Sequence, residues 1–291
     1  MNIIMKLNEI AKDIKETIAQ KQKEFGLEFF EEEHKYYMKD SDGNLKNDFP
    51  SVSTVLKCFY VAFDSESISY KKSGGDPQEQ ERLLKEWADA GEYATNIGSR
   101  THFILEQKSI EMFGIDKKLR EPIFECDIVQ ITKSDSMVKA GEKFLKLMKD
   151  RGAILIDTEM VLGSPELGYT GTPDKLWVME NKEKTGIVLF MTDYKTNKPK
   201  NFVSNRYTKK MKTPFHFLDD TALSHYYVQL PLYGKLMMNM LKGTKYENIK
   251  FVGGVVVLLK DDSDFVEYKI PREVIDTTMN MNVMDYMKNK S

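Results

Sequence analysis

Residues 186–195 read Gly-Ile-Val-Leu-Phe-Met-Thr-Asp-Tyr-Lys, an apolar run that closes on two charged side chains. A short apolar run bounded by turn residues is typical of a buried strand. Residues 176–179 have the same character, and the polar segment 181–186 between the two runs predicts a turn. The two runs therefore predict a β-hairpin, and the preceding Gly-Thr-Pro-Asp places Asp174 at the start of its first strand.

Charged residues lie at the same end of both strands of this hairpin. Alternation along the second strand places Asp193 and Lys195 on one face and Tyr194 on the other. Mg²⁺ and Mn²⁺ prefer oxygen ligands, usually one or two carboxylates with waters and substrate phosphates. Asp174 and Asp193 therefore predict a divalent metal site, with Lys195 beside the attacking water. The alternative is a surface ion pair between Asp193 and Lys195.

The remaining pattern predicts an α/β fold class and a single domain over residues 1–291. Residues 1–150 are mainly helical in pattern, with a small hairpin near 27–50. After residue 150 the pattern changes to mostly apolar strands, and their continuous apolar character indicates a sheet covered on both faces. Residues 151–291 are therefore expected to form an α/β core that carries a helical N-terminal addition.

Helices are expected on both sides of residue 150. Residues 77–113 predict two helices, and residues 135–150 predict a further amphipathic helix. Residues 220–242 predict a helix with Pro231 near its middle. Because proline lacks a backbone N–H and clashes with the preceding turn, Pro231 predicts a kink or a late helix start.

Several of these segments carry polar residues whose positions suit a functional site. His102 and Glu106 lie one helical turn apart, which suits a metal ligand and a supporting carboxylate; a helix-surface pair is the alternative. Gln229 and Tyr233 are also one turn apart, and buried side chains satisfied by neighbouring backbone are the alternative there. Glu159 lies within an apolar strand segment, where a carboxylate is costly to bury unless it is paired or bound to metal.

The charge balance limits the possible partners. A formal net charge of −2 argues against a chain that coats nucleic acid by bulk charge, although the local field at a cleft matters more. Residues 195–212 form a basic segment without an acidic residue. It is either a solvated loop or, given its position after Asp193, a phosphate-binding segment. The residues expected to contact DNA are the basic Lys198, Lys200, Arg206, Lys209, Lys210 and Lys212 and the aromatic Phe202, Tyr207, Phe215 and Phe217.

Other classes of protein are excluded by composition. Cys58 and Cys126 are the two cysteines, too few for a disulfide framework or a four-cysteine iron–sulfur cluster. No apolar stretch approaches the length of a membrane helix, and residues 1–22 lack the pattern of a signal peptide. A protein of the reducing cytoplasm is therefore expected. There is no Gly-x-x-x-x-Gly-Lys-Ser/Thr loop, so any motor that works with the chain is a separate protein.

The motifs occur in this order: Gly-x-x-x-His-x-x-x-Glu at 98–106, Gly-Thr-Pro-Asp at 171–174, Asp-x-Lys at 193–195 and Gln-x-x-x-Tyr at 229–233. This order resembles the RecB-like branch of the PD-(D/E)XK nuclease superfamily, from about Phe49 to Tyr233. Residues 49–56 and 193–199 further resemble the mitochondrial genome maintenance exonuclease group and its phage relatives. The resemblance implies a restriction-endonuclease-like core, with a central mixed β-sheet flanked by helices.

The resemblance also implies roles for single residues. Lys195 would be the catalytic lysine, and Glu106 would support the site. Gln229 and Tyr233 would lie against the catalytic strands and the DNA path, and Glu159 matches an acidic position on the first strand of some members. The ligands of one or two Mg²⁺ or Mn²⁺ ions would be His102, Asp174, Asp193 and the backbone carbonyl of Tyr194.

Members of this branch cut DNA, often at single-stranded ends. The resemblance therefore implies a metal-dependent DNA exonuclease of replication, recombination or repair in a bacterial or phage-infected cell. Its expected partners are DNA and a separate helicase, single-strand-binding or recombination protein, with no membrane. Two alternatives stay open: a structure-specific or restriction-type endonuclease, and a non-cutting DNA-binding module on the same scaffold.

Overall fold

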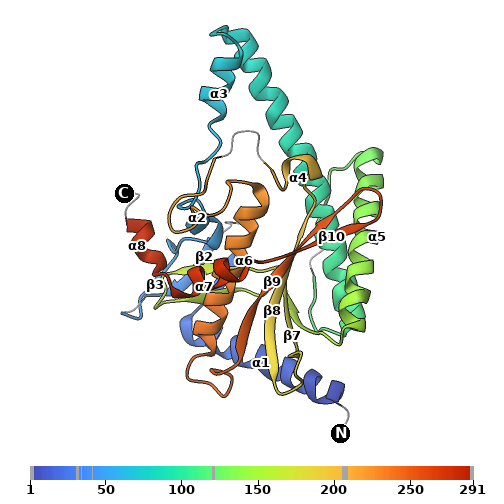
Figure 1. Cartoon of the computed structure of the whole chain (residues 1–291), viewed down its shortest axis with the longest axis vertical. Coiled ribbons are helices and arrows are strands. Elements are labelled where there is room, and N and C mark those ends of the chain that lie inside the picture. Colours follow the sequence, from blue (N-terminus) through green and yellow to red (C-terminus); the bar gives the residue numbers. More distant parts are fainter. Residues whose placement is uncertain are drawn as a thin grey trace.

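A five-stranded sheet lies at the centre of the protein, in the order β10–β9–β8–β7–β4 (Figure 1). The computed structural model describes residues 3–30, 33, 35–40, 42–119, 122–204 and 209–288. β8 and β9 are parallel, and the other neighbours are antiparallel. The α/β class and the mixed sheet are thereby confirmed. The strands are β4 (Ile154–Thr158), β7 (Lys175–Glu180), β8 (Ile187–Lys195), β9 (Lys250–Leu259) and β10 (Phe265–Lys269).

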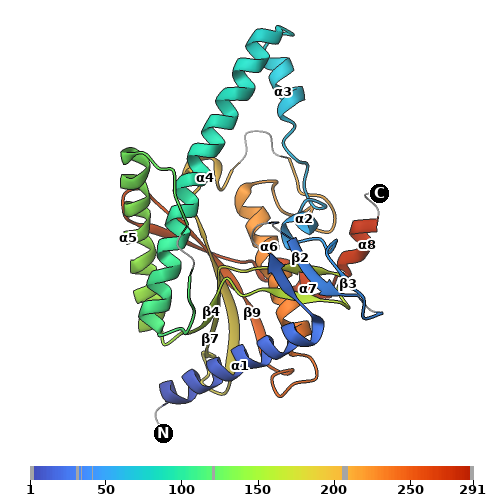
Figure 2. The same cartoon turned by 180° about the vertical axis from the view of Figure 1, so that it is seen from behind.

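Helices cover both faces of this sheet (Figures 1 and 2). One face packs against α1 (Ile3–Phe25) and α6 (Ala222–Leu241), in a core that includes Leu176 and Met191. The other face packs against α4 (Pro77–Phe113) and α5 (Ile128–Asp150), around the fully buried Trp177. Burial on both faces explains the continuous apolar runs in the sequence.

β7 and β8 form the predicted hairpin. Lys175 pairs with Thr192 at one end and Glu180 with Ile187 at the other. The turn closes with a hydrogen bond of 2.9 Å from the Asn181 N–H to the Gly186 carbonyl. The hairpin is in register, so the last residues of β8 lie beside the first residues of β7.

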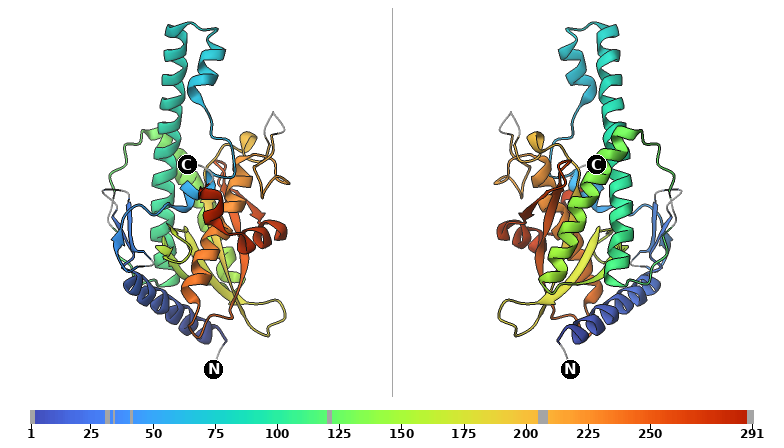
Figure 3. Two further views of the ribbon diagram at one scale, coloured as in Figure 1. Left: turned by 90° about the vertical axis from the view of Figure 1, so that its left-hand side faces the viewer. Right: turned by 90° about the vertical axis from the view of Figure 1, so that its right-hand side faces the viewer.

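α4 is one continuous helix of 37 residues, so the prediction of two helices over 77–113 is wrong. Asp76 caps its start, Pro77 occupies the first turn, and Gly114 ends it with a φ of 65°. Gly91 and Gly98 do not interrupt it, because each interior glycine costs only about 1 kcal/mol. The N-terminal part of α4 and α3 (Ser65–Lys72) project beyond the body as a helical arm (Figure 3).

α6 begins at Ala222, where Thr221 caps it by accepting from the Ser224 N–H. Pro231 lies inside the helix, so the prediction of a late start is wrong. The helix reaches across the sheet from the end of β8 and contacts β5, β8 and β9.

The remaining elements are short. β1 to β3 include the small hairpin predicted near 27–50, and Ser51 caps α2 by accepting from the Thr54 N–H. Within the described residues, no helix is both long and apolar enough to span a membrane. The short elements are β1 (Glu28–Phe30), β2 (Lys35–Lys39), β3 (Leu45–Lys46), α2 (Val52–Leu56), β5 (Leu162–Ser164), β6 (Tyr169–Gly171), the 3₁₀ helix η1 (Pro199–Asn201), α7 (Arg272–Asn280) and α8 (Val283–Lys288).

Candidate metal centre

Asp174 and the end of β8 are joined directly. The Tyr194 N–H donates a hydrogen bond of 2.8 Å to Oδ2 of Asp174. Burial raises the cost of charging this carboxylate, but the positive charges around it and this N–H outweigh burial and lower its pKa. Asp174 is therefore ionised at neutral pH and is available as an oxygen ligand.

The glycine of the Gly-Thr-Pro-Asp motif is required by packing. A Cβ at Gly171 would lie 2.5 Å from the ring of Tyr233 and 2.8 Å from Val52. Only glycine allows β6 to approach α6 and α2 this closely. Gly171 thus brings the segment that ends at Asp174 against α6.

His102 reaches the same carboxylate from α4. Its Nδ1 lies 3.3 Å from Oδ2 of Asp174, and its side chain is 29% exposed. Burial lowers the pKa of the imidazole, against the opposing charge of Asp174 and a hydrogen bond to the Tyr194 backbone. The neutral imidazole that results is the form that binds metal ions.

Glu159 completes a group of three possible ligands. One ligand atom each from His102, Glu159 and Asp174 lies within 4.8 Å of the others. β4 ends at Thr158, so the expectation that Glu159 lies within a strand is wrong. Its φ of 44° turns the chain, and its N–H donates to the Asp174 carbonyl at 3.0 Å. Burial and then the charges of Asp174 and Glu106 raise the pKa of Glu159 to about 8.

Asp193 and Lys195 form a buried ion pair. Lys195 Nζ lies 2.6 Å from Asp193 Oδ2, and Asp193 is only 4% exposed. The ion pair of the alternative is therefore present, but its carboxylate lies in the interior and not on the surface. Burial, followed by the charge of Asp174, raises the pKa of Asp193 to about 7. Burial opposes the charge on Lys195, but Asp193 and Asp174 outweigh it and raise the lysine pKa.

The alternation predicted along β8 is confirmed. Lys195 lies over the ring of Tyr226 on α6, with 4.3 Å between Nζ and the ring centroid. Tyr194 packs on the opposite face, edge-on to His102 and to Phe144 of α5. Asp193 is not part of the three-ligand group found among the described residues. It is close enough to Asp174 for the two carboxylate charges to repel one another.

A divalent cation fits this arrangement. The site offers carboxylate oxygens, which suit Mg²⁺ or Mn²⁺, and one neutral imidazole, a ligand that is common in transition-metal sites. Two carboxylates, the half-buried Glu159 and the buried Asp193, have raised pKa values because they are desolvated and lie near Asp174. A cation would relieve this repulsion and favour their ionised forms.

Lys175 is a further charged residue near the site that the sequence motifs do not predict. This side chain is 3% exposed, and its Nζ lies 4.4 Å from the centroid of the Tyr194 ring. Burial lowers its pKa, while the charges of Asp174 and Glu159 oppose that effect. The available signal was a lysine directly after Asp174, at the head of an apolar strand.

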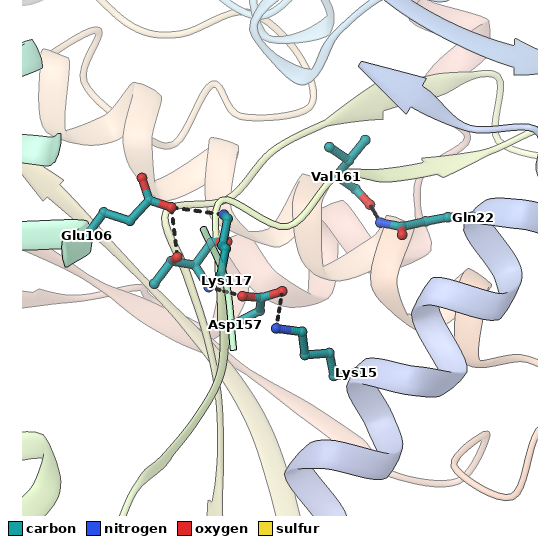
Figure 4. Close-up of polar contacts among 7 residues, drawn as sticks. Lys15, Gln22, Glu106, Lys117, Asp157 and Val161 are labelled. Atoms are coloured by element: carbon teal, nitrogen blue, oxygen red, sulfur yellow. Dashed lines mark hydrogen bonds and ion pairs between the residues drawn. The ribbon is translucent and has the colours of Figure 1, made fainter. Parts of the chain in front are cut away.

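Glu106 does not pair with His102, despite their spacing. Its Oε1 accepts hydrogen bonds from Thr158 Oγ1 at 2.8 Å and from Lys117 Nζ at 2.9 Å (Figure 4). Its side chain is 14% exposed, so the alternative of a helix-surface pair is also wrong. Glu106 lies under the site and acts on Glu159 through charge.

Gln229 and Tyr233 bond to one another. Gln229 Nε2 donates to Tyr233 Oη at 3.1 Å, whereas the alternative was that neighbouring backbone satisfies them. Burial and the charges of Asp193 and Asp174 raise the pKa of Tyr233. Tyr233, on helix α6, therefore lies close to Asp193 and Asp174.

An open cleft of about 430 Å³ leads to the site between α4 and the end of β8. Its lining includes Gly98, His102, Lys195 and Tyr226. A second cavity of about 300 Å³ shares Asn197 and neighbouring lining residues with the first, and continues to Lys198.

The described lysines that follow Lys195 in the basic segment lie outside the central sheet. The lysines among the predicted DNA contacts that the structure describes (Lys198, Lys200, Lys209, Lys210 and Lys212) are exposed. Lys210 pairs with Asp219 at 2.7 Å. Arg206 and Tyr207 lie outside the described residues.

The prediction of base stacking by Phe202 and Phe215 is wrong. Both rings are fully buried in the core that includes α6. Phe217 is partly buried against the same core. The hydrophobic effect places these rings inside despite the polar residues around them in sequence.

No protein-family model matches the chain, and no curated protein matches it either. The function is therefore inferred from the geometry of the site.

Proposed function

We propose that the chain is a metal-dependent DNA nuclease with a PD-(D/E)XK core of the RecB-like type. We propose further that it acts as an exonuclease on single-stranded DNA or DNA ends. One observation carries this: the ligand group of His102, Glu159 and Asp174 lies next to the Asp193–Lys195 ion pair, and His102 and Lys195 line an open cleft. A carboxylate pair with an adjacent lysine is suited to hydrolysis of a phosphodiester.

His102, Glu159 and Asp174 would hold the cation, and Asp193 lies close enough for its charge to contribute. When bound, Mg²⁺ or Mn²⁺ supplies Lewis acidity and lowers the pKa of a water molecule. In the net reaction, the water oxygen bonds to phosphorus, the P–O ester bond breaks, and the departing oxygen gains a proton.

The role of Lys195 follows from its surroundings. Its pKa is raised by Asp193 and Asp174 despite burial, so it remains an ammonium at neutral pH. A permanent cation balances negative charge that develops on phosphate and can orient water by donating hydrogen bonds. It is a poor proton acceptor, which argues against Lys195 as the general base.

The substrate proposal rests on charge and access. The cleft opens next to Lys195, and the adjoining cavity leads to the exposed Lys198. Exposed lysines along a path that starts at the site suit a polyanionic strand.

The test is a nuclease assay on linear and circular single-stranded DNA with Mg²⁺ or Mn²⁺. We expect chelation to abolish cutting and Lys195→Ala to lower kcat by at least about 100-fold. Lys182→Ala is the control, because Lys182 is exposed in the turn at the far end of the hairpin. Undiminished cutting by Lys195→Ala would refute the proposed site.

The same assay separates the alternatives. Equal cutting of circular and linear strands would establish an endonuclease. Mn²⁺ binding without turnover on any DNA would establish a non-cutting module.

A further inference from the structure

Lys117, in the loop after α4, contacts residues next to the candidate metal site. Lys117 Nζ donates to Glu106 Oε1 at 2.9 Å and to the Thr158 carbonyl at 2.7 Å. Thr158 Oγ1 donates to the same Glu106 oxygen at 2.8 Å. The three residues come from a helix, a loop and a strand, and their hydrogen bonds close a ring; Glu106 and Lys117 are labelled in Figure 4.

This ring holds the chain where it turns toward the ligand group. Thr158 is the last residue of β4, and the next residue, Glu159, has a φ of 44°. A residue other than glycine in this conformation is strained and persists when its surroundings determine it. Lys117 donates to the Thr158 carbonyl and the Asp174 carbonyl accepts the Glu159 N–H, so both polar groups of the peptide that enters the turn are held.

A second anchor lies on the opposite side of Thr158. The Thr158 N–H donates to Asp157 Oδ1 at 2.9 Å, and Asp157 Oδ2 pairs with Lys15 Nζ of α1 at 3.2 Å (Figure 4). Both polar groups of the Thr158 backbone are therefore held by charged side chains.

The charges around Glu106 also indicate that Lys117 stabilises this turn. Glu106 and Glu159 are close enough to repel one another. Lys117 contacts Glu106 directly and is itself 26% exposed, against 14% for Glu106. Removing the ammonium would leave a nearly buried carboxylate unpaired beside a ligand carboxylate.

We propose that Lys117 is a positioning residue: through Glu106 and Thr158 it holds the carboxylate of Glu159 in the ligand group. This inference rests on the proposed metal site. Residues that orient ligands from outside the ligand set commonly change metal affinity about 10–100-fold when they are replaced.

The test compares Lys117→Met with Lys118→Met. Lys118 is the next residue and is exposed, so the control removes the same charge from the same loop. Mn²⁺ affinity of the metal-free protein is measured by titration calorimetry, which needs no DNA cutting. We expect Lys117→Met to weaken Mn²⁺ binding about 10–100-fold and Lys118→Met to leave it unchanged.

A kinetic measurement separates positioning from loss of fold. In Lys117→Met the Mn²⁺ concentration for half-maximal cutting should rise, and kcat should largely recover at saturating Mn²⁺. Thr158→Val removes one hydrogen bond of the ring and keeps the shape of the side chain, so it provides the same test if Lys117→Met does not fold.

Unchanged Mn²⁺ affinity in the folded Lys117→Met or Thr158→Val protein would overturn the inference, and so would equal weakening in Lys118→Met. If the wild-type protein binds Mn²⁺ and cuts no DNA, the nuclease proposal fails while the binding comparison still decides the role of Lys117. If the wild type does not bind Mn²⁺, both proposals fail.

Discussion

Oδ2 of Asp174 accepts the backbone N–H of Tyr194 at 2.8 Å and lies 3.3 Å from Nδ1 of His102. One carboxylate oxygen thus joins the residue before β7, the end of β8 and helix α4. Asp174 and Tyr194 belong to one hairpin, whereas His102 comes from a helix that lies far before it in the sequence. Their meeting point is the centre of the candidate site.

The two hairpin carboxylates should differ in their effect on stability. Asp193→Asn removes a buried group whose pKa is raised to about 7, so the metal-free variant should melt at the same temperature as wild type or a few degrees above it. Asp174→Asn removes a group whose pKa is lowered by its partners, so it should melt lower. Differential scanning calorimetry with chelator tests this order.

Both substitutions should abolish cutting. If Asp193→Asn lost far more stability than Asp174→Asn, Asp193 would instead be a residue on which folding depends.

Glu159 and Asp193 should make a contribution to the stability of the metal-free protein that falls as pH rises from about 4 to about 8, while His102, whose pKa is lowered, contributes in the opposite direction. Glu159 and Asp193 have folded-state pKa values of about 8 and about 7, above their ordinary values. The folded state therefore binds more protons than the unfolded state over this range, and its advantage is lost as pH passes these values. Urea unfolding at pH 5, 6.5 and 8 measures the trend.

The double variant Glu159→Gln with Asp193→Asn is the control for this pH dependence. It should flatten the trend, and an equally steep fall would assign the effect to other groups. For wild type, Mn²⁺ affinity should change in the opposite direction and rise with pH, because binding releases protons from the ligands.

Gly171→Ala should destabilise the protein by about 1–3 kcal/mol, since the new Cβ meets the Tyr233 ring at 2.5 Å. Gly91→Ala is a matched control: nothing lies within 4 Å of a Cβ there. It should stabilise α4 by about 0.5–1 kcal/mol. Chemical denaturation of both variants measures the difference, and equal stabilities would contradict the packing argument for Gly171.

Lys198 should contribute to DNA binding through phosphate. Lys198→Ala should weaken binding of single-stranded DNA and reduce the slope of log affinity against log salt by about 0.7. Fluorescence anisotropy over a salt series measures this, in chelator so that no strand is cut. Lys182→Ala, at the opposite end of the hairpin, should leave the slope unchanged. The same slope for Lys198→Ala and wild type would place the DNA path elsewhere.

Local patterns were enough to predict the β7–β8 hairpin and the face of each residue near its end. Asp193 and Lys195 lie together with Tyr194 opposite, because strand alternation depends only on the backbone. Local patterns also predict two helices over residues 77–113, whereas α4 is continuous and packs along α5.

The tertiary structure alone decided which polar side chains meet. Glu159 joins the ligand group because the chain turns after β4, and that turn depends on Lys117, Glu106 and the Asp174 carbonyl. Lys175 and Phe215 are buried for a related reason: burial depends on which distant segment covers a residue. The sequence by itself determined the strands, their faces and the order of the motifs, because these follow from short-range periodicity. Long-range packing decided the composition of the site, because contacts between distant segments depend on how the helices and strands pack together.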